Sequence, residues 1–251
     1  MSIKPLLVDF PASDPASQLA CDEVLLAERE RNGGDAVLRF WEPTSAFVVL
    51  GYTCDVAREV RIDACRARRI PLFRRTTGGG AVVQAPGCLN FSLIVPINSM
   101  PDFATAGGTS AFIMRKSAEA LQQLTPAHIT LSGFSDLTVG TRKCAGSAQR
   151  RLQRFLLFHG SILLGLPLLL VEELLPLPSR QPAYRKGRAH SDFLLNLDLA
   201  AGAVREALQQ AWEIDRSALP YASEKIRRLA LDRYRSDAWT WNRTAPAPHG
   251  G

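Results

Sequence analysis

Apolar residues recur at helical spacing in several separate stretches of the chain. The first covers residues 19–27, after Asp14-Pro15 and before Gly33, which are ordinary start and stop signals of a helix. We therefore predict an amphipathic helix over residues 15–31. Similar spacing predicts further helices over residues 60–69, 107–124, 201–212 and 223–234.

Shorter runs rich in β-branched and aromatic residues predict strands. Those beyond residue 129 are joined by short turns that contain glycine, as in an antiparallel meander. Helices are inserted between the strands, so we predict an α+β fold with a mainly antiparallel sheet flanked by helices. The predicted strands cover residues 36–41, 46–50, 71–75, 81–84, 90–95, 129–131, 136–139, 143–148 and 155–164.

Residues 155–171 carry no formal charge and are rich in leucine, as a membrane helix would be. The stretch is shorter than the about 20 apolar residues that cross a bilayer. His159, Gly160 and Pro167 also interrupt it. A strand, a turn and a helix start explain these interruptions better, and we expect no membrane association.

Length and composition predict one sizeable core, because the chain has 251 residues, of which 46% are hydrophobic and 22% charged. We expect residues 1–197 to form the main domain and residues 198–243 a short helical C-terminal extension of it. Residues 244–251 are rich in alanine, proline and glycine and are expected to be a disordered tail. We expect a monomer.

The net charge of +6 permits an acidic protein partner or a nucleotide-like substrate. The chain lacks the basic and aromatic motif of an RNA-binding module, so we expect no nucleic-acid partner. Its five cysteines form no Cys-x-x-Cys pair, which is typical of reduced thiols in the cytoplasm. Residues 1–10 show no secretion or import signal, and we expect a cytoplasmic protein.

The sequence RRTTGGGAV at residues 74–82 is the first segment whose residue types indicate a ligand-binding site. Consecutive glycines let the backbone approach a ligand and direct N–H groups at a phosphate or carboxylate, while the arginines add positive charge. Taken alone, such a turn more often closes an ordinary hairpin. Neither a Walker motif nor a dinucleotide-binding motif is present.

A single lysine, Lys143, lies just past a tight turn in the second such segment, residues 132–149. The chain has only five lysines and uses arginine freely. A compact ammonium group can contact a carbonyl and a phosphate oxygen together and stabilise charge that develops during acyl transfer. The alternative is a solvated lysine at the end of a strand.

Together with HGSIL at residues 159–163, these two segments resemble the lipoate-protein ligase and octanoyltransferase family. This family belongs to the biotin/lipoate A/B protein ligase superfamily. The three motifs occur in the family's order and spacing, and the resemblance extends over about residues 19–197. It implies a biotinyl/lipoyl-transferase catalytic domain that resembles class II aminoacyl-tRNA synthetases, with an acyl group in a tunnel under the glycine turn.

The resemblance implies that Lys143 is the catalytic residue and holds the acyl carbonyl and the adenylate phosphate. Asp136 would orient the nucleotide or the incoming lysine. For His159 we favour a structural role, because it begins an apolar strand and is not expected to face another titratable group. No resident metal is implied. The full set expected to bind the acyl group or adenylate is Arg75, Thr77, Gly78, Gly79, Gly80, Ala81, Asp136, Gly146, Ser147, Ala148 and His159.

The acyl donor depends on whether a thiol serves as nucleophile, since octanoyltransferases of this superfamily form a thioester on a cysteine. In the most similar branch that cysteine lies upstream of Asp136, where this chain has Thr-Leu-Ser at residues 130–132. Strand alternation should turn Cys144 into the core if Lys143 faces the site. Cys88 is the better remaining candidate.

The missing cysteine favours an ATP-dependent lipoate-protein ligase. ATP and Mg²⁺ would convert lipoate or octanoate into an acyl-adenylate. The acyl group would pass to a lysine of a lipoyl carrier domain, such as H-protein, an E2 lipoyl domain or a lipoate-binding protein. One alternative is an octanoyl or lipoyl transferase that takes its acyl group from an acyl-carrier protein or another lipoyl protein. Another is a non-catalytic carrier-binding protein.

Some features depart from the family pattern. Gln84-Ala85 replaces a frequent His-Asp pair, and Tyr52-Thr53 replaces common arginine or glutamine residues, which puts the contacts made there in doubt. Only 54 residues follow Leu197, too few for the accessory domain of bacterial ligases, so a separate subunit could supply it. The basic residues 181–190 are either a solvated loop or a clamp for ATP phosphates or an acidic carrier.

Overall fold

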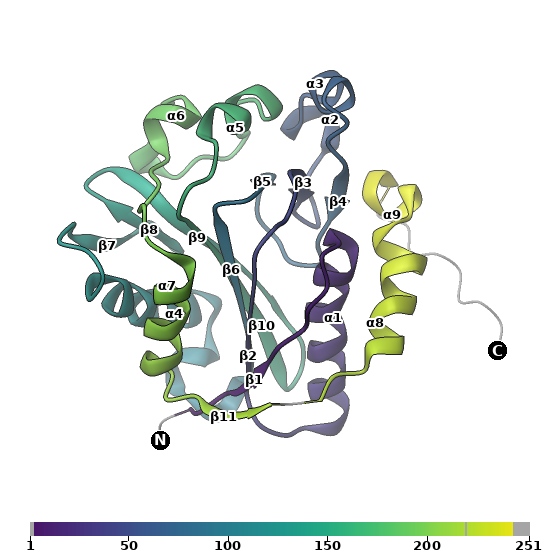
Figure 1. The fold of residues 1–251 in the computed structure, drawn as a ribbon, viewed down its shortest axis with the longest axis vertical. Helices are drawn as coiled ribbons and strands as arrows, with labels where there is room; N and C mark the ends of the chain where they lie inside the picture. Colours follow the sequence, from purple (N-terminus) through teal and green to yellow (C-terminus); the bar gives the residue numbers. More distant parts are fainter. Residues whose placement is uncertain (1–2, 219, 243–251) are drawn as a thin grey trace.

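The computed structural model describes residues 3–218 and 220–242, and an eight-stranded sheet forms its centre (Figure 1). β1 runs parallel to both β11 and β2, while the other neighbouring strands are antiparallel. This confirms the mainly antiparallel sheet. In spatial order the strands are β11 (Asp215–Ala218), β1 (Leu6–Val8), β2 (Val37–Trp41), β6 (Cys88–Pro96), β10 (Phe155–Leu163), β9 (Arg142–Arg151), β8 (Asp136–Val139) and β7 (Ile129–Ser132).

A second, three-stranded sheet carries the glycine turn between two of its strands. Its order is β4 (Leu72–Arg74), β3 (Phe47–Leu50) and β5 (Val82–Gln84), with β3 parallel to β4 and antiparallel to β5. Short helices lie beside this sheet at the top of Figure 1. They are α2 (Val56–Glu59), α3 (Ile62–Ala67), α5 (Leu168–Leu174) and α6 (His190–Phe193).

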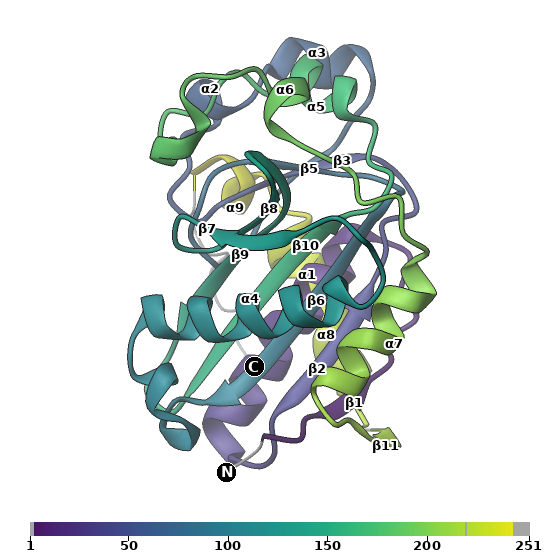
Figure 2. The same ribbon diagram turned by 90° about the vertical axis from the view of Figure 1, so that its left-hand side faces the viewer.

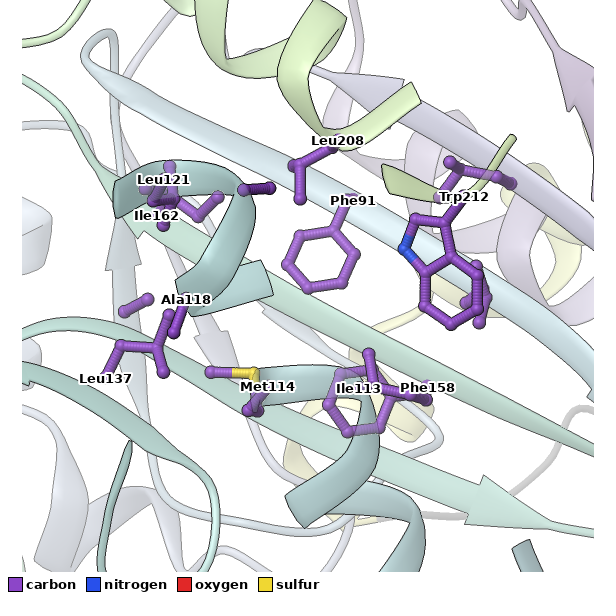
Figure 3. Packing of buried hydrophobic residues seen from close by; sticks show 14 of the residues in the cluster. Phe91, Ile113, Met114, Ala118, Leu121, Leu137, Phe158, Ile162, Leu208 and Trp212 are labelled. Atoms are coloured by element: carbon purple, nitrogen blue, oxygen red, sulfur yellow. The ribbon is translucent and has the colours of Figure 1, made fainter. Parts of the chain in front are cut away.

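Helices cover both faces of the large sheet. α4 (Ala106–Gln122) and α7 (Ala201–Ala211) lie on one face, in front of the sheet in Figure 2, and α1 (Pro15–Asn32) and α8 (Ser223–Leu229) lie on the other. Strand side chains alternate, so Phe91 and Phe158 enter the core under α4 (Figure 3), while Ser92 and His159 face α1. Each buried phenylalanine stabilises the fold by about 1.5–3 kcal/mol.

The apolar stretch at residues 155–171 forms β10, a turn and the first part of α5, as predicted. Leu163 at the end of β10 and Val171 and Leu174 of α5 are buried in one apolar cluster. Within the described residues, the chain has no helix that combines the length and the apolar character of a membrane span.

Several elements differ from the prediction. The helix expected over residues 60–69 is shorter and begins later, as α3 (Ile62–Ala67), because Val60 is extended and ends the preceding helix, α2, which was not predicted. The helix expected over residues 223–234 consists of α8 followed by a π-helical turn, η4 (Ala230–Tyr234). A further helix, α9 (Asp237–Asn242), comes after it. Strands β1 and β11 were not predicted. The expected tail at 244–251 lies outside the described residues. The short 3₁₀ turns are η1 (Ile97–Ser99), η2 (Pro101–Ala104) and η3 (Ala183–Arg185).

Asp14 caps α1, and its replacement by alanine should destabilise the protein by about 1 kcal/mol. Its Oδ1 accepts hydrogen bonds from the Ser17 N–H and from Arg235. Burial alone would raise the pKa of the Asp14 carboxyl, but these bonds and the Arg235 charge outweigh it, so the pKa lies below its ordinary value.

Because the pKa of Asp14 is lower in the folded state, the stabilisation is complete above the unfolded pKa of about 3.9 and disappears as the pH falls through the folded value. Urea denaturation of the Asp14→Ala variant should therefore show the full loss at pH 7 and a smaller loss at low pH. An equal loss at every pH would contradict this origin of the stabilisation.

Candidate functional site

A cavity of about 280 Å³ lies between the α1 face of the large sheet, the three-stranded sheet and the segment after α5. One wall is apolar and includes Trp41, Val49 and Leu163, whereas Lys143, Asp136 and Arg75 supply charge elsewhere. Its other predicted lining residues are Gly79, Gly80, Ala81, Gly146, Ser147, Ala148 and His159. The structure therefore brings together most of the residues that the sequence singles out. Thr77 and Gly78 do not line this cavity.

Arg75 holds the glycine turn in shape. Its Nη2 donates hydrogen bonds to the carbonyls of Gly78 (2.7 Å) and Gly80 (3.1 Å), and burial lowers the pKa of its guanidinium to about 10. Gly79 has a φ of +93°, which favours glycine. The guanidinium of Arg75, which the sequence analysis expects to bind the acyl group or the adenylate, thus donates several of its hydrogen bonds to carbonyls of the turn.

Lys143 lines the cavity and is ion-paired with Asp136. The Lys143 Nζ is 2.8 Å from Asp136 Oδ1, and both side chains are largely buried. A β-bulge places the lysine there, because Leu137 pairs with Ala145 while Thr138 pairs with Lys143. Lys143 then lies over Gly146, where a Cβ atom would come within 2.5 Å of its Nζ.

His159 faces a titratable group, contrary to the sequence prediction. Its Nδ1 is 3.3 Å from Asp22 Oδ2 on α1, and its Nε2 is 2.8 Å from Thr77 Oγ1 in the glycine turn. Register explains the pairing, since Arg39, Ser92 and His159 form one row across β2, β6 and β10 on the face toward α1. The sequence offered no sign of Asp22, because an aspartate within an apolar helix has no distinctive spacing.

Asp22 is charged although it is buried. Arg39 Nη1 lies 2.5 Å from Asp22 Oδ1, and the Ser92 hydroxyl donates to Oδ2. Burial alone would raise the pKa of the Asp22 carboxyl, but the charge of Arg39 and the hydrogen bond with His159 outweigh it, and the pKa is lowered. The carboxylate therefore anchors His159, which in turn anchors the glycine turn through Thr77.

Replacing Thr77 with valine should destabilise the protein by about 1–2 kcal/mol. Valine has nearly the same shape as threonine but lacks the hydroxyl, so His159 Nε2 loses this partner. Chemical denaturation measures the change. Thr77→Ser is the matched control because it keeps the hydroxyl. If valine and serine have the same stability, the hydrogen bond to His159 does not hold the turn.

None of the five cysteines lines the cavity, and all of them are among the described residues. Cys144 is buried in the core, as predicted. Cys88, the better of the remaining thiols, is also buried, and burial raises the pKa of its thiol to about 11, which disfavours it as a nucleophile. The partly exposed thiol is that of Cys54, which donates to the Gly79 carbonyl at 3.2 Å and which the sequence analysis did not single out.

The basic residues 181–190 are not a solvated loop throughout. Arg185 is buried, and Arg185 and Arg188 both pack on the ring of Phe193. Arg185 lines the cavity, and its Nη2 is buried without a hydrogen-bond partner among the described residues. Tyr184, which the sequence did not mark, donates a hydrogen bond to Asp136.

Gln84 replaces a residue that the family often has as histidine, and it belongs to a polar cluster in the cavity wall. Its Nε2 donates to Asn90 Oδ1 (3.1 Å) and to Ser161 Oγ (2.7 Å), and Asn90 Nδ2 donates back to Gln84 Oε1. These groups satisfy one another, which limits the cost of burying them. Within the described residues, no three histidine, cysteine, aspartate or glutamate side chains are grouped as a metal site requires.

Comparison with known proteins gives a consistent result. The model of the "Lipoyl protein ligase A/B catalytic domain" matches residues 14–213. The "Putative lipoate-protein ligase A" of Aeropyrum pernix is 34% identical over 160 residues, which are 63% of this chain but only 57% of that protein. The "Octanoyltransferase LipM" of Staphylococcus aureus is 26% identical over an alignment that covers 94% of this chain and 98% of the relative.

Solved structures share the fold. A bi-partite lipoate protein ligase of Thermoplasma acidophilum superimposes with a TM-score of 0.81 at 22% identity, covering 99% of this chain and 100% of that one. A lipoate-protein ligase A bound with ATP gives a TM-score of 0.74 at 24% identity, covering 97% and 100%. At these identities the likeness establishes the α+β architecture of the chain.

Proposed function

The chain belongs to the family of lipoyl protein ligase A/B catalytic domains, and we propose that it is an ATP-dependent lipoate-protein ligase. The carboxylate of lipoate or octanoate attacks the α-phosphorus of ATP, and pyrophosphate leaves. A lysine amine of a lipoyl carrier domain then attacks the acyl carbonyl, and AMP leaves. Each step develops negative charge next to the acyl carbonyl, where a fixed ammonium group is most effective.

The observation that carries the proposal is that Lys143, paired with Asp136, lines a cavity whose wall also includes the apolar residues Trp41, Val49 and Leu163. From Gly146, beneath Lys143, a row of paired residues crosses the sheet through Ser161 and Asn90 to Trp41. Three steps between strands span about 14 Å. An extended acyl chain fits along this row with its carboxyl end at Lys143 and its apolar end toward Trp41.

Two further observations favour a free acid and ATP as the source of the acyl group. No thiol lines the cavity, so a covalent acyl-cysteine intermediate has no nucleophile there. Arg185 Nη2 has no hydrogen-bond partner within residues 3–218 and 220–242, which favours an anion near the cavity and suits the phosphates of ATP. Mg²⁺ would arrive with these phosphates and neutralise part of their charge.

The acceptor is proposed to be a lipoyl carrier domain, such as H-protein, an E2 lipoyl domain or a lipoate-binding protein. The neighbour from Thermoplasma acidophilum is described as a bi-partite ligase together with its E2 lipoyl domain. By analogy with that bi-partite ligase, we propose that a separate accessory subunit takes part here too. We propose a monomeric, cytoplasmic catalytic subunit.

An octanoyltransferase is the second candidate, because the LipM relative aligns over nearly its whole length. The two activities separate in one experiment with a purified apo carrier domain. One tube receives lipoate, ATP and Mg²⁺ with the purified chain, alone or together with its accessory subunit. The other receives octanoyl-acyl-carrier protein without ATP, and mass spectrometry follows the acceptor. We expect modification in the first tube. Modification in the second tube alone would replace the ligase with the transferase.

A further inference from the structure

Tyr184 touches the carboxylate that holds the candidate catalytic lysine. The Tyr184 hydroxyl donates to Asp136 Oδ2 at 2.7 Å, while Lys143 Nζ lies 2.8 Å from the other oxygen, Oδ1. We propose that Tyr184 is a positioning residue that fixes Lys143 through Asp136. This inference rests on the proposed function, since it assigns Tyr184 to the acyl-transfer reaction.

The two hydrogen bonds restrict the carboxylate in a specific way. Each oxygen of Asp136 is engaged by a different partner, so rotation of the carboxylate breaks at least one contact. Gly146 lies directly beneath the ammonium group and limits its movement toward the sheet. Lys143 Nζ is thereby held in one place before a substrate binds, and such preorganisation lowers the barrier of a reaction that develops charge.

Tyr184 itself is held in place by contacts on two sides. Its ring lies 5.3 Å from the ring of Phe193, measured between centroids. Its carbonyl accepts a hydrogen bond from Arg188 Nη2 at 3.0 Å, and the same nitrogen donates to the Thr141 carbonyl, just before Lys143. The segment that carries the tyrosine is thus tied to the strand that carries the lysine.

The phenol remains protonated, and so a hydrogen-bond donor, at neutral pH. Burial raises the pKa of Tyr184 well above its ordinary value, and the neighbouring negative charge of Asp136 raises it further. A water molecule in this place would have to be ordered by the protein, whereas the tyrosine hydroxyl is already fixed by its ring. The hydroxyl therefore has a role that phenylalanine cannot perform.

The test is Tyr184→Phe, which keeps the ring against Phe193 and removes only the hydroxyl. We expect kcat to fall about tenfold, the effect of losing one hydrogen bond to a charged group, with KM for the acyl donor unchanged. Tyr221→Phe is the control, since Tyr221 packs against Phe10 outside the cavity and should have no effect. A higher KM with unchanged kcat would overturn the proposal, because it would mean that Tyr184 binds substrate directly.

A double-mutant cycle shows whether the effect passes through Asp136. In an Asp136→Asn background, Tyr184→Phe should change kcat by less than about twofold, since the carboxylate that it positions is absent. An undiminished tenfold loss in that background would refute the coupling. The rates are measured with whichever donor the wild-type protein uses, so a transferase activity would leave this comparison valid.

A spectroscopic measurement tests the same point without any activity. Reductive ¹³C-methylation labels the five lysines, and a Lys143→Arg variant assigns the Lys143 signal. In Tyr184→Phe that signal should move, whereas the signals of the other lysines, Lys4, Lys116, Lys186 and Lys225, should stay. An unchanged Lys143 signal would overturn the proposal even if the wild-type protein proved inactive with both donors.

Discussion

Replacing Lys143 with alanine is expected to lower the rate of acyl transfer by about a thousandfold, the upper effect of removing one group that stabilises developing charge. The ammonium group is held in the cavity wall by Asp136, and no other lysine lines the cavity within the described residues. A neutral methyl group in its place leaves the acyl carbonyl and the phosphate without this partner. Mass spectrometry of the carrier domain over time measures the rate.

Lys116→Ala is the matched control, because Lys116 belongs to α4, has its ammonium group over the Trp212 ring and does not line the cavity. It should transfer at the wild-type rate. Lys143→Ala should also keep its affinity for the carrier domain, measured by calorimetry. A wild-type transfer rate in Lys143→Ala would remove the basis of the catalytic assignment and favour a carrier-binding protein.

Replacing Gly51 with alanine is expected to disable the site from a distance. A Cβ atom at Gly51 would lie 1.9 Å from the Gly79 carbonyl oxygen and 2.8 Å from its carbon, so the glycine turn must move. We expect a loss of about 3 kcal/mol in the free energy of unfolding, as for severe overpacking. A displacement of the turn on the order of 1 Å should lower the rate by about a hundredfold.

Gly202→Ala is the control for this prediction, because Gly202 lies in α7 and an added Cβ atom meets nothing within 4 Å. It should keep wild-type activity and gain slightly in stability, since alanine favours a helix over glycine by about 1 kcal/mol. Thermal unfolding and steady-state kinetics measure both properties. If Gly51→Ala behaves like Gly202→Ala, the contact between Gly51 and the turn does not position the site.

Local patterns predicted most of the regular structure. The helix at residues 15–31 and the strands of the meander are specified by spacing along the chain, and the structure confirms them. Strands β1 and β11 could not be predicted, because each is short and is stabilised by pairing with a distant partner. The break at Val60 likewise depends on tertiary contacts that a helical pattern does not contain.

The motifs predicted which residues would meet, but not how they would contact one another. The glycine turn, Lys143 and Asp136 all reach one cavity. The pairing of His159 with Asp22 and of Tyr184 with Asp136 joins segments 137 and 48 residues apart. Such contacts follow from strand register and from the path of the segment after α5, neither of which has a local signal. The burial of Cys88 likewise depends on surrounding elements and has no local signal.

The central claim is that this chain activates a free acid with ATP at the cavity that contains Lys143. Exchange of labelled pyrophosphate into ATP reports that step directly and needs no carrier domain. We predict exchange with the purified chain, or the chain with its accessory subunit, that depends on added lipoate and is lost in Lys143→Ala. No exchange under either condition, with octanoyl transfer from an acyl-carrier protein intact, would contradict the account.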